Sequence, residues 1–318
     1  MVERMAVTSQ LLSVRQSALR FKQWLPVVID RKTRVFAWLS LVSQILIVGT
    51  GGAVRLTGSG LGCPTWPSCT PESLVPTPEM GIHGAIEFGN RMMTFVLIII
   101  AIGMFVRVVR LRHERRDVFT LSLILGFGIP FQGVIGGITV WTNLNPYVVG
   151  LHFVLSTSLV VLATVLVWRV YSGAGPRVRT VPAWLATTAH VTSAFVLITI
   201  LVGIATTGSG PHAGDHGAAR NGLDSELLQH VHSWPAYITL GLSVALVVAA
   251  YAMRHPRMLR FGVILLLVEA VQIIVGVAQA RMGLPALLVG LHMVLACVLA
   301  SAVTAVVLSL KETAPVAD

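Results

Sequence analysis

The chain has 318 residues, of which 55% are apolar and only 11% are charged, and its mean hydropathy is +0.81. Soluble globular proteins carry about 25% charged residues, so this composition excludes a water-soluble domain and indicates a protein of the lipid bilayer. The formal net charge of +10 is then a signal of membrane topology, and we do not interpret it as a nucleic-acid-binding surface.

The first 33 residues are polar and basic, and we expect them to form a cytoplasmic tail without the apolar region and cleavage site of a secretory signal. Eight apolar stretches follow, each long enough to cross a hydrocarbon core of about 30 Å as a helix. They cover residues 34–54, 87–109, 118–140, 147–170, 182–205, 228–253, 259–280 and 287–310. The predicted fold class is therefore an all-α polytopic membrane protein with eight transmembrane helices.

The basic residues indicate which side of the membrane each loop faces. Nearly all of the 23 Lys and Arg residues fall in the two tails, at adjacent helix ends, or in the loops after the second, fourth and sixth spans. The exceptions are Arg55, Arg91, Arg220 and Arg281. Because cytoplasmic loops are enriched in Lys and Arg, we expect a multi-pass protein of the cell membrane with both termini in the cytoplasm.

The second half of the chain repeats the first. Gly-Leu-His at 150–152 returns at 290–292, Thr-Gly-Ser-Gly at 57–60 returns at 207–210, and Gln132 and Gln272 occupy equivalent places. Four spans separate equivalent points, so the halves have the same orientation about an axis along the membrane normal. We expect two pseudo-symmetric four-helix bundles, at residues 34–171 and 182–310, with a cytoplasmic linker at 172–181 and a cytoplasmic tail at 311–318.

Histidines inside the apolar helices are the candidate functional residues, because a desolvated imidazole needs a partner and a haem iron supplies one. His152 and His292 lie about six residues into spans that begin outside, roughly 9 Å deep. Aligning the halves places Asn90 and His232 at matching depth. The second half thus offers His232 opposite His292, an arrangement that holds a six-coordinate haem between helices, whereas the first half offers Asn90 and His152.

Several motifs together point to a known family. They are the Gly-Gly-Ala-Val-Arg-Leu-Thr-Gly-Ser-Gly-Leu-Gly-Cys-Pro run at 51–64, Trp-Pro-Ser-Cys at 66–69, the motif around Glu87 and the two Gly-Leu-His elements. With them the chain resembles, over roughly residues 34–310, the haem A synthases, eight-span enzymes that oxidise the C8 methyl group of haem O to the formyl group of haem A. The resemblance implies a haem b cofactor bound by His232 and His292, and a substrate haem bound in the first half by His152.

The sequence departs from the family pattern at Asn90, where the resemblance predicts a second histidine at the substrate site. An amide is a poor haem ligand, so three arrangements of the substrate iron stay open. The iron is five-coordinate on His152, or is ligated by another group such as His83, or binds a water molecule held by Asn90. The predicted iron ligands are accordingly His152, His232 and His292.

Glu87 is the candidate catalytic residue. It lies three residues before Asn90 and therefore on the same helix face, and we expect it to position haem O or to handle protons during oxidation of the methyl group. The alternative is a first-turn acid that only stabilises the helix through its dipole. Arg55 and Arg91 are expected to meet haem propionates or anionic lipid headgroups.

Cys63 and Cys69 lie in the first external loop, an oxidising location where so close a pair can form a disulfide. The resembled family has a comparable pair. A role in holding the loop and a redox role both stay open. Cys297, inside the last span, is interpreted as a small core residue.

The implied partners are haem O, the haem O synthase that delivers it, an unidentified electron donor and membrane lipid. A homo-oligomer is compatible with the sequence, and no nucleic acid is expected. The alternative function is a di-haem b membrane electron-transfer protein that leaves its haem unmodified. A transporter with parallel repeats would explain the duplication but not the histidines near the external surface.

Overall fold

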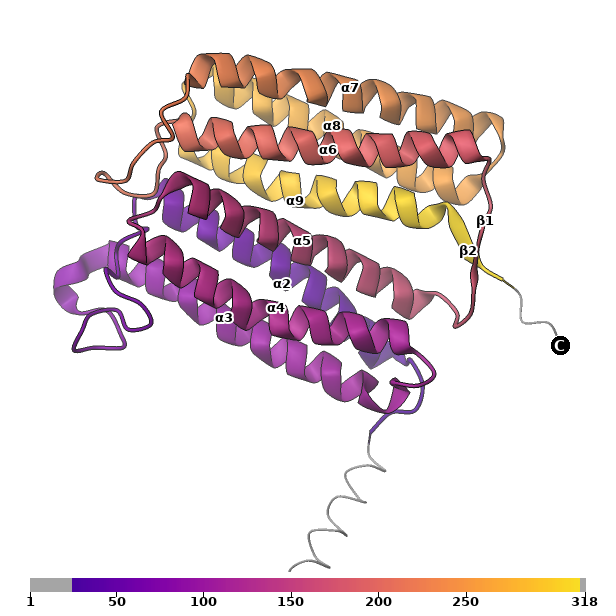
Figure 1. The fold of residues 1–318 in the computed structure, drawn as a ribbon, viewed down its shortest axis with the longest axis horizontal. Coiled ribbons are helices and arrows are strands. Elements are labelled where there is room, and N and C mark those ends of the chain that lie inside the picture. Colours follow the sequence, from indigo (N-terminus) through magenta and orange to yellow (C-terminus); the bar gives the residue numbers. More distant parts are fainter. Residues whose placement is uncertain (1–24, 315–318) are drawn as a thin grey trace, which may run out of the picture.

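The computed structural model of the protein describes residues 25–314, so the predicted tail residues 1–24 and 315–318 lie outside the described part of the chain. Eight long helices run side by side (Figure 1), and each is long and apolar enough to cross a membrane. The predicted all-α fold with eight spans is confirmed. In the bilayer interior a helix satisfies all of its own backbone hydrogen bonds, which is why each apolar stretch of this chain folds as one.

The helices fall into two consecutive groups of four. The first group is α2 (Arg31–Leu56), α3 (Gly81–Val108), α4 (Arg116–Trp141) and α5 (Pro146–Tyr171). The second is α6 (Ala183–Ser209), α7 (Ser225–Ala252), α8 (Pro256–Arg281) and α9 (Ala286–Ser309). Two short 3-10 turns, η1 (Pro78–Met80) and η2 (Val109–Leu111), flank α3.

Polar side chains fix where several helices begin. Asp30, Asn145 and Asp224 accept hydrogen bonds from first-turn backbone amides of α2, α5 and α7, and each thereby satisfies donors that a helix start leaves unpaired. Asp30 also pairs with Arg107 near the end of α3. Burial opposes ionisation of Asp30, but the hydrogen bonds from Arg107 and Thr33 outweigh it and lower the pKa of this carboxyl to about 2.

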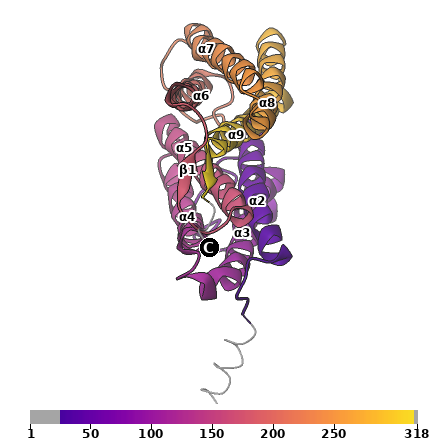
Figure 2. The ribbon, with the colours of Figure 1, turned by 90° about the vertical axis from the view of Figure 1, so that its right-hand side faces the viewer.

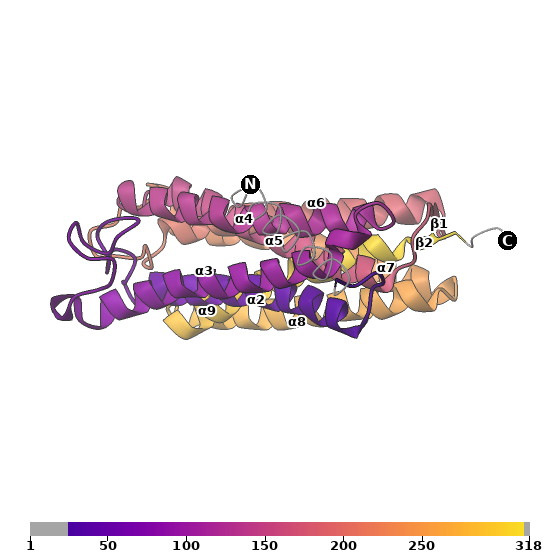
Figure 3. The ribbon, with the colours of Figure 1, turned by 90° about the horizontal axis from the view of Figure 1, so that it is seen from below.

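The two groups form two bundles that lie side by side, with their helices running in roughly the same direction (Figures 1 and 3). Seen end-on in Figure 2, the second bundle lies against one side of the first. α9 packs against both α2 and α5, and α6 packs against α5, so the halves meet through these four helices. The chain is therefore two four-helix units, as the internal repeat predicts.

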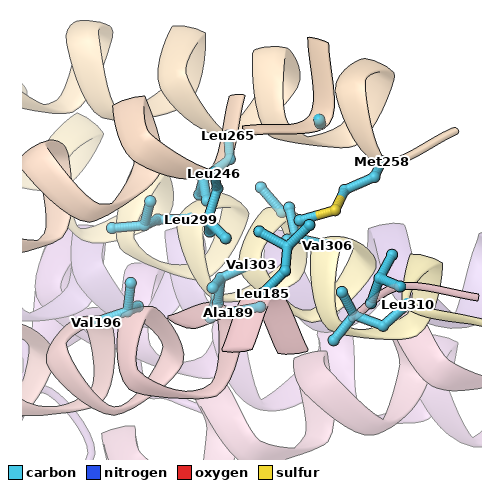
Figure 4. Close-up of a cluster of buried hydrophobic side chains, with 14 of the residues drawn as sticks. Leu185, Ala189, Val196, Leu246, Met258, Leu265, Leu299, Val303, Val306 and Leu310 are labelled. Atoms are coloured by element: carbon cyan, nitrogen blue, oxygen red, sulfur yellow. The ribbon is translucent and has the colours of Figure 1, made fainter. Parts of the chain in front are cut away.

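The two larger clusters of buried apolar residues lie toward one end of each bundle, the end at which α2 and α6 begin, and a small third cluster of Leu144, Ala213 and Ala218 lies at the other end. In the second bundle they include the residues shown in Figure 4, namely Leu185, Ala189, Val196, Leu246, Met258, Leu265, Leu299, Val303, Val306 and Leu310. The first bundle has an equivalent cluster, which Cys297 of α9 joins at 0% exposure. Phe153 packs against both clusters. The opposite ends of the helices are left to enclose a cavity.

A short sheet was not predicted. In the linker, β1 (Arg177–Arg179) pairs antiparallel with β2 (Lys311–Thr313), which places Arg177 opposite Thr313 and Arg179 opposite Lys311. Strands of three residues are too short to show an alternating pattern, and they pair here because α5 and α9 end, and α6 begins, close together. The linker at 172–181 and the chain after α9 therefore hold the two bundles at this end.

One helix boundary differs from the prediction with consequences for the site. α3 begins at Gly81 rather than at residue 87, because hydropathy detects only the apolar part of a helix whose outer turns are polar. Glu87 therefore lies about two turns inside α3, beyond the first turn in which the helix dipole acts. The interpretation of Glu87 as a first-turn acid is wrong, and His83 lies in the first turn of α3.

Close packing of α2 on α3 gives a first prediction. Gly103 of α3 faces Phe36 of α2, and a Cβ atom at this position would overlap the Phe36 ring. We expect Gly103→Ala to lower the Tm of the purified protein in detergent, since overpacking costs about 1–3 kcal/mol and exceeds the helix-propensity gain of about 1 kcal/mol.

Gly126→Ala in α4 is the matched control, because no atom lies within 4 Å of the added Cβ. We expect its Tm to be equal to or higher than that of the unmodified protein. Equal Tm values for the two variants would contradict the prediction.

Candidate functional site

A cavity of about 1030 Å³ lies between the helix ends opposite the apolar core, and residues of all eight helices line it. Ligand pockets in proteins span about 300–1,000 Å³, so this one has room for a large ligand. Glu87, Asn90, His152, His232 and His292 all lie on its wall. Residues that the sequence separates by up to two thirds of the chain are thus brought to one chamber that both bundles share.

Three imidazoles on the cavity wall have unsatisfied nitrogens. Nδ1 of each of His152, His232 and His292 is buried and has no hydrogen-bond partner among the described residues. A buried polar atom without a partner costs about 1–3 kcal/mol, and helices in a membrane have no bulk water to meet it. These histidines therefore fit a site whose ligand supplies the missing partner, as a metal does for imidazole nitrogen.

The second bundle presents two of these rings to one another. His232 of α7 and His292 of α9 have ring centroids 6.2 Å apart and ring planes at 73°. Two metal–imidazole bonds of about 2 Å each, with the distance from each nitrogen to its ring centre added, give a separation of about 6 Å. The pair consequently fits an iron between the rings, which is the ligand set of a six-coordinate haem.

Small and polar neighbours set the positions of these rings. A Cβ at Gly203 would lie 2.9 Å from His232 Cε1, and a Cβ at Gly276 would lie 3.0 Å from His292 Cε1. Gln272 Nε2 lies 3.3 Å from His292 Nε2 and also donates to the His292 carbonyl oxygen at 3.2 Å. Each ring is therefore held in a space that only glycine leaves free.

The first bundle repeats this arrangement with different groups. A Cβ at Gly136, the counterpart of Gly276, would lie 3.5 Å from His152 Cε1. Gln132 donates to the His152 carbonyl oxygen at 3.2 Å and to Ser156 Oγ at 2.7 Å. Asn90 accepts a hydrogen bond from Thr50 Oγ1 at 2.7 Å. The predicted interhelical hydrogen bonds of the two equivalent glutamines are thus present in both halves.

Glu87 joins α3 to the loop between α2 and α3. The residue is 5% exposed, and its carboxylate accepts a hydrogen bond from Cys63 N at 2.6 Å and pairs with Arg91 at 2.6 Å. Arg91 in turn donates to four loop carbonyls, those of Cys63, Thr65, Pro67 and Ser68. The carboxylate thus lies on the cavity wall and at the same time holds the loop that covers the cavity.

Arg55 plays a corresponding part for the other external loop. Its Nε donates to the His212 carbonyl oxygen at 2.6 Å and its Nη2 donates to the Thr207 carbonyl oxygen at 3.0 Å. Both arginines that we expected at haem propionates or lipid headgroups line the cavity. In the protein Arg55 bonds the carbonyl oxygens of His212 and of Thr207 in the last turn of α6, and Arg91 bonds the Glu87 carboxylate and loop carbonyls.

The external loop carries the two cysteines. Cys63 and Cys69 are both fully buried, and their side chains meet at the distance of a disulfide, with Cα atoms 4.5 Å apart. Trp66, between them, packs on Trp141 with ring centroids 5.4 Å apart and lines the cavity. The loop thus forms part of the roof of the chamber.

Other candidates are placed elsewhere. His83 lies on α3 with Nδ1 2.9 Å from Ser59 Oγ and does not line the cavity. In residues 25–314 no group of three or more His, Cys, Asp or Glu side chains is placed to hold a metal ion. Glu269 of α8 lines the cavity, accepts a hydrogen bond from Ser243 Oγ at 2.7 Å, and leaves its second oxygen buried without a partner.

Sequence reasoning missed two sets of contacts. Thr50 carries no motif, and only the packing of α2 on α3 brings it to Asn90. The pair of Glu87 and Arg91 is four residues apart, a spacing that is typical of helical ion pairs. This spacing was visible in the sequence. The hydrogen bond from Cys63 N to Glu87, however, depends on a loop conformation that no sequence pattern indicates.

Comparison with known proteins adds the family. The COX15-CtaA model, described as a cytochrome oxidase assembly protein, matches residues 34–85 and 79–304. The chain belongs to this family. The resemblance to haem A synthases is thereby confirmed, and family membership together with eight spanning helices makes the chain a multi-pass membrane protein.

Individual relatives match over part of their length. Proteins named heme A synthase are 30% identical over 142 residues in Geobacillus thermodenitrificans and 32% identical over 148 residues in Lysinibacillus sphaericus strain C3-41. The first match covers 43% of both chains, and the second covers 44% of this chain and 47% of the relative. A heme A synthase of Exiguobacterium sibiricum is 28% identical over 55% of this chain and 59% of its own. The matched part thus spans about half the length of these relatives.

The role of Arg91 in holding the loop is testable by proteolysis. We expect Arg91→Ala to raise the rate at which a protease cleaves the loop between Cys63 and Pro78 by roughly 5- to 100-fold. The reason is that loss of about 1–3 kcal/mol of contacts to a buried carboxylate raises the population of the open loop.

Arg281→Ala is the control, because Arg281 ends α8 at the same end of the bundles as this loop and makes no side-chain hydrogen bond within the described residues. In this variant the loop between Cys63 and Pro78 should be cleaved at the unmodified rate. Slow cleavage of the Arg91→Ala variant would show that the loop is held without this side chain.

Proposed function

We propose that the protein is a haem A synthase, an enzyme that oxidises the C8 methyl group of haem O to a formyl group and so provides haem A for cytochrome oxidase. Family membership and the relatives named heme A synthase support the proposal. The observation that carries it is the pair of facing imidazoles of His232 and His292 in the same cavity as His152. One chamber would thereby join a cofactor site to a substrate site.

In this proposal the second bundle, residues 182–310, binds a haem b cofactor through His232 and His292. When bound, that haem supplies electron transfer, the chemistry suited to an iron with two imidazole ligands. The chain's own contribution is to fix the rings. Gln272 orients His292, and Gly203 and Gly276 leave the space that the imidazoles need.

The first bundle, residues 34–171, would bind haem O as the substrate, with His152 as the iron ligand and Asn90 on the facing wall. Haem O would enter laterally from the membrane after delivery by the haem O synthase. Two successive hydroxylations of the methyl carbon, each consuming one O2, two electrons and two protons and releasing one water molecule, would give a geminal diol, which loses water to leave the aldehyde. An unidentified donor would provide the electrons.

Glu87 and the loop above it would prepare the substrate site. Glu87 lies on the cavity wall on the same helix as Asn90, which supports a part in placing haem O or in moving protons at its carboxylate. Trp66 and Pro67 line the outer end of the cavity and would keep bulk water from the reacting methyl group. A disulfide between Cys63 and Cys69 would stabilise this cover.

The basic loops support a cell-membrane protein whose termini both lie in the cytoplasm. The apolar packed end of the bundles then faces the cytoplasm, and the cavity faces the external half of the membrane. The Cys63–Cys69 pair lies on the oxidising side, where disulfides persist. This orientation is consistent with entry of both haems at the external half of the membrane.

Extraction and mass analysis of haems from cells that make haem O, with and without this protein, test the function directly. We expect haem A or its hydroxylated precursor only when the protein is present, and we expect His152→Ala to abolish both. Haem O that persists unchanged beside protein that holds haem b would instead favour an electron carrier. The haem b content of the His152→Ala variant serves as the folding control, since its cofactor site is intact.

Glu87→Gln tests the role of the carboxylate separately from that of the loop. The amide keeps one oxygen that can accept from Cys63 N but loses the negative charge. We expect haem A formation to fall by about 100-fold or more, the size of a lost acid–base contribution, with loop cleavage less affected than in Arg91→Ala. Full haem A production by Glu87→Gln would remove the catalytic role, and equal loop opening in the two variants would reduce Glu87 to a structural residue.

A further inference from the structure

The two bundles place different groups at one equivalent position. His232 of α7 and Asn90 of α3 line the same cavity from the corresponding helices, and the partner imidazoles, His292 and His152, come from α9 and α5. The second bundle therefore pairs an imidazole with an imidazole, whereas the first pairs an imidazole with an amide. Duplication supplied one architecture, and this single position makes the two sites chemically unequal.

Contacts of Asn90 decide what the amide can do. Its Oδ1 lies 2.7 Å from Thr50 Oγ1, whose single hydroxyl proton also lies within reach of the Ile47 carbonyl oxygen at 3.1 Å, so the one amide atom that is able to coordinate a metal already has a neighbouring donor. Its Nδ2 is a donor with no lone pair to offer, and no described group accepts a hydrogen bond from it. The neighbouring residue on α2 is Gly51, which has no side chain to cover Nδ2; a Cβ there would lie 4.0 Å from this atom.

No other histidine completes the first site. His83, the substitute that the sequence offered, is bonded to Ser59 and lies off the cavity wall. His212, which does line the cavity, lies in the other external loop with Nε2 2.8 Å from the Leu284 carbonyl oxygen. Among the described histidines that line the cavity, His152 is the only one on the helices of the first bundle, and the internal repeat places Asn90 where the second bundle has His232.

We propose that Asn90 keeps the axial position opposite His152 open on the substrate haem and donates a hydrogen bond from Nδ2 to a small ligand bound there. The inference rests on the proposed function, because it concerns how haem O is held. An iron with two imidazole ligands has no position for a further ligand and suits electron transfer, whereas an iron with one histidine and a distal hydrogen-bond donor binds small molecules. The duplicated bundles thus divide binding of a small ligand from electron transfer.

Carbon monoxide is the probe, since it binds only ferrous haem with an open axial position. The protein is purified from cells that make haem O, its haems are extracted and counted, and the reduced holoprotein is titrated with CO. We expect one CO per protein, carried by the first site and absent in His152→Ala. Asn90→His should lower CO binding at least tenfold, because an added imidazole closes the position.

Asn90→Leu tests the donor itself. We expect CO still to bind, with a shifted CO stretching frequency and a dissociation rate about threefold to tenfold higher, the effect of one lost hydrogen bond. The matched control is His232→Asn, which gives the second site the amide of the first and should add a second CO. The same frequency and rate in Asn90→Leu as in the unmodified protein would overturn the donor role.

The outcomes separate this inference from the proposed function. Protein that contains haem O or haem A beside haem b but binds no CO would overturn the open position and leave the haem A synthase proposal intact. Protein that contains only haem b would overturn the proposed function, and with it the inference. The visible spectrum of Asn90→His provides a further check, because it should gain a low-spin six-coordinate signal that a merely structural asparagine would not produce.

Discussion

The structure depends on the cost of leaving imidazole nitrogens without partners in an apolar bundle. Three histidines have a buried Nδ1 that no described group meets, and the surrounding membrane has no bulk water that could meet it. Each such nitrogen costs about 1–3 kcal/mol, which a ligand in the chamber would recover. The packed apolar ends of both bundles, where Leu185, Leu246 and Val303 lie fully or nearly fully buried, supply the rigidity that keeps the opposite ends apart.

Separation of packing from binding along the helix axis explains several other features. Clusters of buried aliphatic residues occupy the end that carries the β1–β2 pairing, and polar residues concentrate at the other end around the cavity. There the external loops are held by Arg55 and Arg91, whose planar guanidinium groups meet several backbone carbonyls at once. The roof of the chamber is thus fixed by charge-assisted hydrogen bonds, and its floor by close packing.

Duplication gives the chain two sites of one design, and small differences give them different properties. Gly136 and Gly276 make room for equivalent imidazoles, and Gln132 and Gln272 bridge equivalent helices. Gln132, however, bonds to Ser156, whereas Gln272 approaches the His292 ring directly. With Asn90 in place of a histidine, the first site has one fewer imidazole than the second, which supports the proposed division into a substrate site and a cofactor site.

The sequence by itself determined the eight spans, the duplication and the depth of His152, His232 and His292, because hydropathy, repeats and helical rise are properties of local sequence. It also indicated Glu87, although it placed the start of α3 too late and therefore left a first-turn acid open as an interpretation of this residue. Only the tertiary structure decided that Glu87 holds the Cys63 backbone, that Thr50 engages Asn90 and that both bundles share one cavity. Such contacts join helices and loops far apart in the chain, and their geometry follows from packing, which no local pattern encodes.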